Sequence, residues 1–420
     1  MMQLQDRTPR LAGARRKLLL GIVTIATIAL SGCSGSTPSS AGSASGSPLT
    51  IGISLSLTGD FSDSGKSAQR GYTLWADLVN KSGGILGRQV KLSVVDDASS
   101  PDQVVTNYTN LITRDKVDIV FGPFSSLLTV PASRVANRYG YSFIEPAGGG
   151  PSVFAQKLNN LFFVQPAETT KGGDVFADYI LSLPSGQRPK TAAYAKLDDP
   201  FSAPIADNIK SRFEAAGIKT VYDQTYPAET ADMTPVVSGI AAAKPDVVIG
   251  GTQEADAFAQ IKAMIQLKFN PKWLFEANGA NSPGDFPAAV GKANTEGVFS
   301  SADWYADSTV AGSAKFISDY TKKFGGTADQ IDPTSAEAYS AGVLLEQVAK
   351  KTGKIDNATI IKTLHSGTWP TLVGNLSWDA SGKPKGAYLL VQWISGKLTT
   401  VFPAKTSQHA PVAPKPNWAG

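Results

Sequence analysis

Two adjacent serines, Ser125 and Ser126, follow the apolar segment 117–121 and open a segment with the composition of a helix. The first backbone N–H groups of a helix have no intrahelical acceptor, and the helix dipole favours negative charge there. Serine hydroxyls can add hydrogen bonds at the same place. The pair therefore predicts a site for a small anion such as a carboxylate. The alternative is that one of the serines only caps the helix, since serine is a favoured N-cap residue.

A second group of backbone donors is expected at Ala147, Gly148 and Gly149, which follow the next strand-like segment, 141–144. Small residues let a ligand approach the backbone closely. Because the carboxyl ends of neighbouring parallel strands meet at one edge of a sheet, these residues would face the same anion from another side. Two consecutive glycines are equally compatible with an ordinary tight turn.

Catalytic chemistry has little support in this composition. The chain has only two histidines, His365 and His409, and His365 has no nucleophile motif near it. No histidines or cysteines are paired at metal-ligand spacing, and the run 83–87 lacks the Lys-Ser/Thr that completes a phosphate-binding loop. We therefore expect no enzyme activity, no bound metal and no cofactor.

The candidate residues belong to a repeating pattern of short apolar strands and longer helical segments. In the segment 66–81, Ala68, Tyr72, Trp75 and Val79 recur every three or four residues, which predicts a helix with one apolar face. The strand-like segments are 49–57, 89–95, 117–121 and 141–144 in a first series, then 190–195, 219–226 and 246–249 in a second. The helical segments between and after them are 101–114, 126–139, 201–216, 231–243 and 254–267.

Such alternation predicts an α/β protein in which parallel sheets are covered by helices on both faces. About 350 residues run from Leu49 to Phe402, which suits two domains better than one core. Two sheets in tandem create a cleft, and ligands of such sheets lie beyond the carboxyl ends of the strands. We expect the ligand to lie in that cleft.

The only cysteine, Cys33, marks the end of a secretion signal. Basic residues between Arg7 and Lys17 precede an uncharged apolar run at 18–30, which is too short to cross a bilayer as a helix. A chance cysteine beside a transmembrane anchor is the alternative. The pair Arg15-Arg16 is also compatible with twin-arginine export.

The charge of the mature chain argues against nucleic acid as a partner. The whole chain carries +4, but its first 32 residues hold five basic residues and one acid, so the remainder has no net charge. Nucleic-acid-binding proteins normally present a positive patch or stripe. Residues 34–48 are almost wholly Ser, Gly, Ala, Thr and Pro, which predicts a flexible tether. A second cysteine is absent from the sequence, so no intrachain disulfide can form.

Motifs from residue 49 to about residue 402 resemble the extracytoplasmic solute-binding proteins that feed branched-chain amino acid ABC importers. Each motif is weak alone, but their order and spacing are specific. They are Ile51-Gly52-Ile53 through Leu57-Thr58-Gly59, Asn80 through Arg88, Val95-Asp96-Asp97, Gly122-Pro123 with Ser125-Ser126 and Pro131-Ala132, Asp198-Asp199-Pro200-Phe201, Pro245-Asp246-Val247-Val248, and Trp378-Asp379 with Gly382 and Gly386. The residues Leu30-Ser31-Gly32 before Cys33 resemble a lipobox, which implies cleavage before Cys33 and acylation of its thiol.

The resemblance implies two doubly wound parallel-sheet lobes joined by a three-crossover hinge, the type I periplasmic binding protein arrangement. The crossovers are expected near Gln165, Ser300 and Leu376. The resulting domains are a signal peptide at 1–32, the lipidated cysteine and linker at 33–48, an N-terminal lobe at 49–165 plus 301–375, a C-terminal lobe at 166–300 plus 376–402, and a disordered tail at 403–420.

In the resembled family, a serine equivalent to Ser125 or Ser126 and nearby amides bind the ligand's carboxylate. The resemblance further implies an aromatic contact from Phe201, polar contacts from Thr252 and Gln253, and a carboxylate for the ligand's ammonium at Glu276. Trp304, just after a crossover, could wall the apolar end of the pocket. Amino-acid-binding relatives commonly have threonine where this chain has Gly149, which leaves a plain carboxylate or an amide open as the ligand.

The expected function is delivery of a small amino acid, branched-chain or otherwise apolar, to the permease subunits of an ABC importer. The expected location is outside the cytoplasm, on the cell membrane through a lipid on Cys33, and we expect a monomer. A ligand-sensing receptor domain of the same fold is the alternative from another functional class. The lipid anchor favours transport, because a sensor usually carries its own transmembrane helix.

Overall fold

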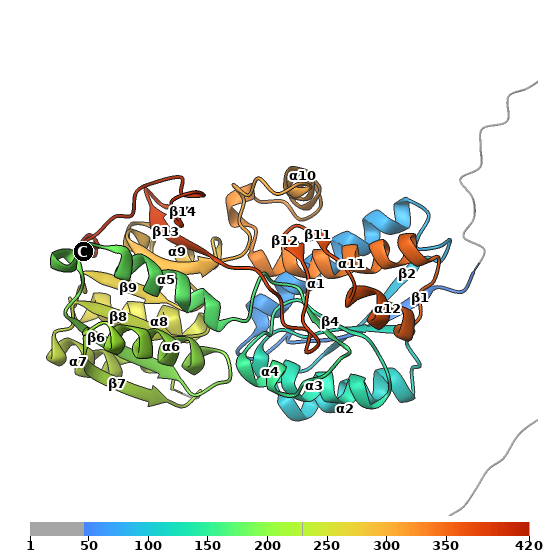
Figure 1. Cartoon of the computed structure of the whole chain (residues 1–420), viewed down its shortest axis with the longest axis horizontal. Coiled ribbons are helices and arrows are strands. Elements are labelled where there is room, and N and C mark those ends of the chain that lie inside the picture. Colours follow the sequence, from blue (N-terminus) through green and yellow to red (C-terminus); the bar gives the residue numbers. More distant parts are fainter. Residues whose placement is uncertain (1–45, 229, 420) are drawn as a thin grey trace, which may run out of the picture. The chain divides into compact units, whose positions relative to one another are not determined.

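The computed structural model describes residues 46–228 and 230–419. The predicted signal peptide, the lipidation site Cys33 and most of the linker lie outside the described residues. Within the described part, the chain alternates strands and helices that build two large sheets and a small two-stranded ribbon. We call each large sheet with the helices packed on it a lobe (Figure 1). No helix in the described ranges is both long and apolar enough to cross a bilayer.

The first lobe contains a sheet of order β2-β1-β3-β4-β5, in which every neighbouring pair is parallel. Its strands are β1 (Leu49–Leu55), β2 (Val90–Asp96), β3 (Ile119–Phe121), β4 (Phe143–Glu145) and β5 (Leu161–Phe163). Successive strand residues point to opposite faces, and both faces are apolar, as expected of a sheet buried on both sides.

Helices cover the two faces of this sheet (Figure 1). One face packs on α1 (Ser62–Lys81), α10 (Ser313–Phe324), α11 (Pro333–Thr352) and α12 (Asn357–Leu364). The other packs on α2 (Pro101–Thr113), α3 (Ser126–Arg138) and α4 (Pro151–Ala155). The predicted apolar face of α1 is confirmed, since Ala68, Tyr72, Trp75 and Val79 are all buried.

The second lobe repeats this arrangement and extends it. Its sheet has the order β14-β13-β10-β9-β8-β6-β7; the strands from β6 to β10 run parallel, whereas β13 and β14 are antiparallel additions. The strands are β6 (Thr191–Leu197), β7 (Lys219–Tyr226), β8 (Val247–Gly251), β9 (Trp273–Glu276), β10 (Val298–Ala302), β13 (Leu389–Ile394) and β14 (Lys397–Phe402). One face packs on α5 (Thr170–Ser182) and α6 (Ser202–Ala215), the other on α7 (Thr234–Ala243), α8 (Glu254–Gln266) and α9 (Asp285–Val290).

The predicted fold class is confirmed, because two doubly wound sheets follow one another along the chain. Three short 3₁₀ turns, at Ser185–Gln187, Lys292–Thr295 and Ala328–Gln330, and the ribbon of β11 (Trp369–Thr371) and β12 (Gly374–Leu376) complete the described elements. In both sheets the strand order reverses beside the first strand, between β1 and β3 and between β6 and β8. Such reversal points are where ligands of open α/β sheets bind.

The chain passes between the lobes after β5, after β10 and after β12, close to the expected crossovers. The expected boundaries at 301 and 376 differ from the structure by a few residues. Ser301 and Ala302 still pair with β13 in the second sheet. Trp378 belongs to the first lobe, because its indole N–H donates to the Phe163 carbonyl at 2.7 Å and its ring meets Phe162 edge-on.

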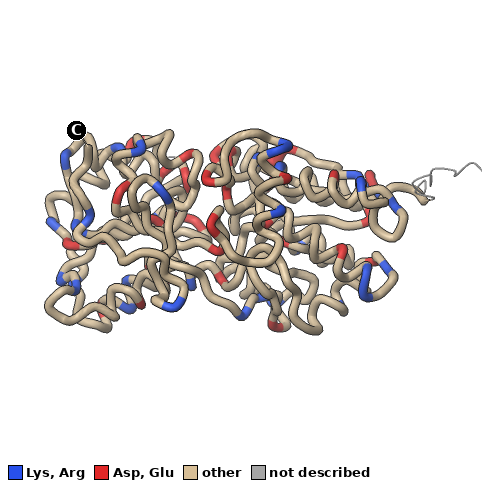
Figure 2. Tube along the Cα trace, turned by 90° about the horizontal axis from the view of Figure 1, so that it is seen from above, with Lys and Arg blue, Asp and Glu red and all other residues tan. Residues whose placement is uncertain are grey.

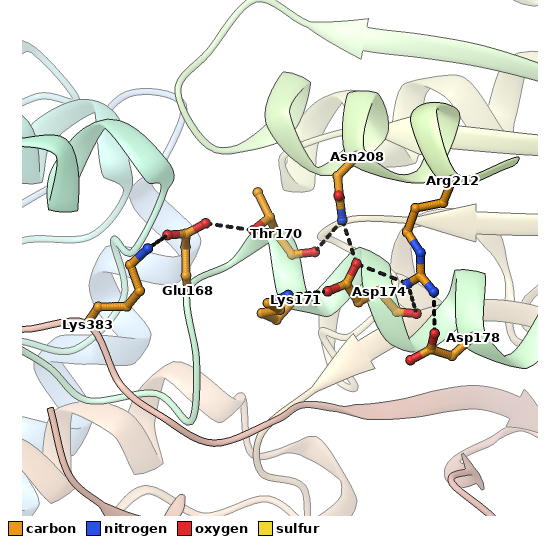
Figure 3. Close-up of polar contacts among 8 residues, drawn as sticks. All are labelled: Glu168, Thr170, Lys171, Asp174, Asp178, Asn208, Arg212 and Lys383. Atoms are coloured by element: carbon orange, nitrogen blue, oxygen red, sulfur yellow. Dashed lines mark hydrogen bonds and ion pairs between the residues drawn. The ribbon is translucent and has the colours of Figure 1, made fainter. Parts of the chain in front are cut away.

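One ion pair holds the first and third connections together (Figure 3). Lys383, after β12, pairs with Glu168, before α5. Nearby, the guanidinium of Arg212 on α6 reaches Asp174 and Asp178 of α5. The first pair joins two connections of the hinge, and the Arg212 pairs fasten α6 to α5 within the second lobe.

The prediction of a disordered tail at 403–420 is wrong for the described residues 403–419. The backbone N–H of Val412 donates to the side chain of buried Gln392, which returns a hydrogen bond to the Val412 carbonyl, both at 2.8 Å. The indole N–H of Trp418 donates to the Phe269 carbonyl at 2.7 Å, and Lys415 is 4% exposed. Prolines suggested disorder, but docking on the second lobe supplies the partners that the segment cannot find within itself.

Candidate functional site

A cavity of about 70 Å³ lies between the two lobes. Its walls come mainly from loops that follow the carboxyl ends of parallel strands, as the fold class predicts. The first lobe supplies Phe124 and Ser125 after β3, with Ala147 and Gly148 after β4. The second lobe supplies Phe201 after β6, Gln253 after β8 and Asn278 after β9.

Ser125 is held at the start of α3 in an unusual backbone conformation. Its φ of 77° lies in a region that residues other than glycine rarely adopt. Its backbone N–H donates to the Ala147 carbonyl at 2.8 Å, which joins the loops after β3 and β4. The hydroxyl is buried and has no hydrogen-bond partner in the protein, so it remains available to a ligand.

Ser126 and Gly149, both predicted to bind the ligand, do not line the cavity. The Ser126 hydroxyl accepts a hydrogen bond from the Gly150 N–H at 2.9 Å, and the Gly149 carbonyl accepts one from the Thr169 N–H at 3.0 Å. A Cβ atom added at Gly149 would lie 2.2 Å from the ring of Phe163. A threonine here would therefore clash with the core, and the glycine is explained by packing.

In the second lobe, Phe201 and Gln253 line the cavity as predicted. The Gln253 amide donates to Asp199 Oδ2 at 2.7 Å and accepts from the Asn278 amide at 3.2 Å. The Gln253 side chain is therefore fixed before any ligand arrives. Phe201 is half-buried and begins α6, where it presents an aromatic surface to the cavity.

Glu276 and Thr252, also predicted to bind the ligand, lie behind the wall of the cavity. Glu276 is completely buried and accepts hydrogen bonds from the Thr252 hydroxyl at 3.0 Å and the Gln260 amide at 2.7 Å. Burial raises the pKa of Glu276 to about 8, and these two hydrogen bonds only partly oppose the shift. Glu276 is therefore a protonated structural acid at neutral pH, and it does not reach the cavity.

Trp304 also lies away from the cavity. Its indole N–H donates to the Ser313 hydroxyl at 3.2 Å, and its ring packs edge-on against Phe316 of α10. The side chain is 1% exposed and belongs to the core of the first lobe. Its place just after a crossover predicted a pocket wall, but packing explains it.

The structure adds a polar group at the hinge that the sequence analysis missed. Glu337 of α11 lines the cavity and accepts a hydrogen bond from the Gln165 amide at 2.8 Å. The Tyr388 hydroxyl donates to the other end of Gln165 at 2.6 Å. Asp303 and Asp332 line the same region. The missed signal was that Glu337 is the only charged residue in the small-residue run 333–345.

The charged residues that line the cavity are all acidic. Asp303, Asp332 and Glu337 line it, and no lysine, arginine or histidine of the described residues does so. Acidic positions also gather where the two lobes meet (Figure 2). Burial raises the pKa of Asp303 to about 7, and burial and the neighbouring Asp303 raise that of Glu337. The described residues contain no group of three or more His, Cys, Asp or Glu side chains placed to hold a metal ion.

The lobes touch each other beside the cavity. The Ser64 hydroxyl of α1 donates to Glu254 Oε2 of α8 at 3.2 Å. At another point, a Cβ atom added at Gly150 would lie 2.3 Å from the carbonyl oxygen of Pro200, so the backbones meet closely there. The arrangement can therefore enclose a small molecule between two surfaces that a hinge could separate.

Comparisons with known proteins agree with this geometry. The periplasmic binding protein family matches residues 48–397. The Leu/Ile/Val-binding protein homolog 1 of Brucella abortus is 26% identical over 393 residues, which cover 91% of this chain and 97% of that protein. An amino acid binding protein of Pseudomonas aeruginosa is 25% identical over 346 residues, covering 82% of this chain and 90% of that protein.

Solved structures share the fold at lower identity. A branched-chain amino acid transporter substrate binding protein of Streptococcus pneumoniae in complex with isoleucine superimposes with a TM-score of 0.74 at 19% identity, covering 84% of this chain and 97% of that one. An ABC transporter solute binding protein of R. palustris in complex with benzoate gives 0.75 at 20%, covering 88% and 98%. Since the family match spans most of the sequence and the cavity lies between two lobes of this fold, the chain belongs to the periplasmic binding protein family, whose members bind solutes and are not enzymes.

Proposed function

We propose that this protein is the solute-binding component of an ABC importer, and that it binds a small amino acid between its lobes and delivers it to the permease subunits. The observation that carries the proposal is the cavity itself, whose walls come from both lobes. A ligand held by both walls makes all of its contacts only when the lobes are closed, so it shifts the population toward closure. A permease could therefore distinguish the closed, ligand-bound protein from the open protein by its shape.

The residues that line the cavity support an amino acid as the solute. At the start of α3, the unpartnered Ser125 hydroxyl and the loop at Ala147 and Gly148 suit a carboxylate. The aromatic ring of Phe201 offers an apolar contact to a side chain. The similarity to Leu/Ile/Val-binding proteins points in the same direction.

A plain carboxylate is the second candidate. The benzoate-bound relative has a comparable fold, and the Ser125 end of the cavity does not by itself distinguish an amino acid from any other carboxylic acid. The distinction depends on whether a cationic group is also recognised.

A thermal-shift panel on the mature chain tests the proposal. We expect leucine, isoleucine or valine to raise the unfolding temperature in a concentration-dependent way, because a ligand that binds only the native state stabilises it by mass action. Benzoate and 4-hydroxybenzoate serve as comparison ligands. If only these acids raised the unfolding temperature, the amino-acid assignment would be wrong and the solute-binding role would remain.

We further propose that a lipid on Cys33 anchors the protein to the outer face of the cell membrane, with residues 34–48 as the tether. The support is the sequence of the leader, since Cys33 lies outside the described residues. Two or more acyl chains are sufficient for stable membrane attachment.

A further inference from the structure

We infer that the carboxyl groups of Asp303 and Glu337 form the cation-binding subsite of the cavity, and that the transported solute must carry an ammonium group that sits between them. This inference rests on the proposed solute-binding function and adds to it the class of ligand: an ammonium-bearing molecule, not a plain carboxylic acid. It also assigns the ammonium to the hinge and not to Glu276.

The two carboxyl groups meet at the junction of the lobes. Asp303 directly follows β10, in the second connection, and Glu337 lies on α11 of the first lobe. Both line the cavity, together with Gln165 of the first connection and Tyr388 of the third. Residues of all three described connections therefore line the cavity.

The surroundings hold Glu337 in place but leave it incompletely satisfied. The Gln165 amide donates to Glu337 Oε1, and Tyr388 holds Gln165 from the other side. Oε2 of Glu337 and Oδ2 of Asp303 are buried and accept no hydrogen bond from an N–H or O–H group of the described residues. The two carboxyl groups lie within hydrogen-bond reach of each other, so one proton can join them while the cavity is empty. Buried polar atoms normally find a partner, and two facing carboxyl groups that lack a protein donor need either a proton or a cation between them.

The acidic groups around the cavity indicate that this partner is a cation. Two neighbouring carboxylates in a buried site repel each other, and ionising both is costly unless a cation is placed between them. Asp332 is the third acid lining the cavity and adds to the negative potential. No lysine or arginine among the described lining residues offsets these groups.

An ammonium group satisfies this site better than the alternatives. It brings one positive charge and three N–H donors, enough to serve both free oxygens and one further acceptor. A metal ion would need more ligands than this pair offers, and the described residues provide no such cluster. A plain carboxylate would bring a further negative charge to a wall that already holds three acids, and it would be repelled.

The test uses matched probes on the full mature chain in detergent: leucine, its des-amino analogue isocaproate, and its decarboxylated analogue isoamylamine, each titrated calorimetrically. Benzoate and benzylamine form a second pair. For wild type, we expect leucine to bind at least about tenfold more tightly than isocaproate. If the benzyl pair binds, we expect benzylamine to bind at least about tenfold more tightly than benzoate.

Glu337→Gln and Asp303→Asn should each weaken binding of the ammonium probe by about tenfold or more and leave the weak binding of isocaproate unchanged or improved. Both variants should be about as stable as wild type when empty, because each replaces one member of a pair that shares a proton with a neutral amide of the same shape. Glu346→Gln is the matched control: Glu346 lies on the same helix but accepts a hydrogen bond from Trp75 and does not line the cavity.

The outcomes separate this inference from the proposed function. If wild type binds leucine and both variants bind it equally well, the subsite is wrong and the amino-acid function stands. If isoamylamine binds and leucine does not, the subsite is right and the amino-acid function is wrong. If isocaproate or benzoate binds more tightly than its ammonium partner, or if no ammonium-bearing probe binds, the subsite is wrong.

Discussion

Glu276 of β9 lies directly against Gly250 of β8, its register partner, so closely that a Cβ atom added to the glycine would come within 1.8 Å of Glu276 Oε2. The first lobe repeats the arrangement: a Cβ atom on Gly122, just after β3, would lie 1.9 Å from Glu145 Oε2 at the end of β4. Burial raises the pKa of both glutamates to about 8. The two acids occupy equivalent places in two similar sheets, which favours a structural role for each.

The first prediction concerns the pH dependence of stability. The folded-state pKa of Glu276 lies above its unfolded value of about 4.5, so its contribution to the free energy of unfolding is fully present below about pH 4.5 and is lost as pH rises through about 8. Glu276→Gln should remove that component, on the order of a few kcal/mol between those limits. Urea denaturation of both proteins from pH 5 to 9 measures it. Affinity for leucine should change by less than about twofold; a tenfold loss would return Glu276 to the ligand site.

The second prediction separates the two serines. Ser125→Ala should weaken binding of an amino acid by about 1–3 kcal/mol, the usual effect of losing a hydrogen bond to a charged group, with little change in stability. Ser126→Ala should do the opposite: it leaves the dissociation constant unchanged and lowers stability by about 1 kcal/mol, because the Gly150 N–H loses its acceptor. Calorimetric titration and thermal unfolding of both variants check the pair. Equal effects on binding would contradict the assignment.

The third prediction follows from the paired acids at the hinge. Since the pKa of Asp303 is raised to about 7, the empty pair retains a proton at pH 6, and an ammonium ligand should displace it. Binding of leucine at pH 6 should therefore release up to about one proton. Titration in two buffers with different ionisation enthalpies measures the number released. Glu337→Gln should reduce the release; unchanged release would assign the proton to another acid of the cavity wall, such as Asp332.

The fourth prediction tests the docked tail. Deleting residues 411–420 should lower the free energy of unfolding by roughly 2–4 kcal/mol, because buried Gln392 loses both of its Val412 partners and Trp418 loses its contact with Phe269. Trp418→Phe, which removes one hydrogen bond and keeps an aromatic ring, should cost only about 1 kcal/mol. Chemical denaturation gives both values. A truncated chain as stable as the full one would support the original expectation of a free tail.

The fifth prediction concerns the anchor. Cys33→Ser should move the protein from the membrane fraction to the supernatant, because the acyl chains can no longer be attached. Ligand affinity and unfolding temperature should not change, since a tether of about 15 residues separates Cys33 from the folded part. Fractionation followed by thermal unfolding checks both points. A variant that still sediments with membranes would mean that something other than lipid on Cys33 holds the protein there.

The fold class, and the edge of each sheet at which a ligand is expected, follow from local patterns in the sequence. Strand and helix periodicity are local properties, so the alternation of 49–57 with 66–81 and its later repeats could be recognised without any contact between distant residues. The topology of parallel sheets then requires the loops at Ser125, Ala147 and Phe201 to face one cleft. In the structure, these three residues line the cavity.

Whether a given side chain reaches the cavity or packs in the core depends on contacts that exist only in the folded chain. Glu276, Ser126 and Trp304 lie at or after strands whose carboxyl ends face the cleft. Their hydrogen-bond partners in the structure are Gln260, Gly150 and Ser313 respectively, and no sequence motif indicates these partners. Conversely, Asp303 and Glu337 stand 34 positions apart, and neither carries a motif. They become a site because the hinge brings both to one wall, where burial turns two ordinary acids into a pair that lacks a cation.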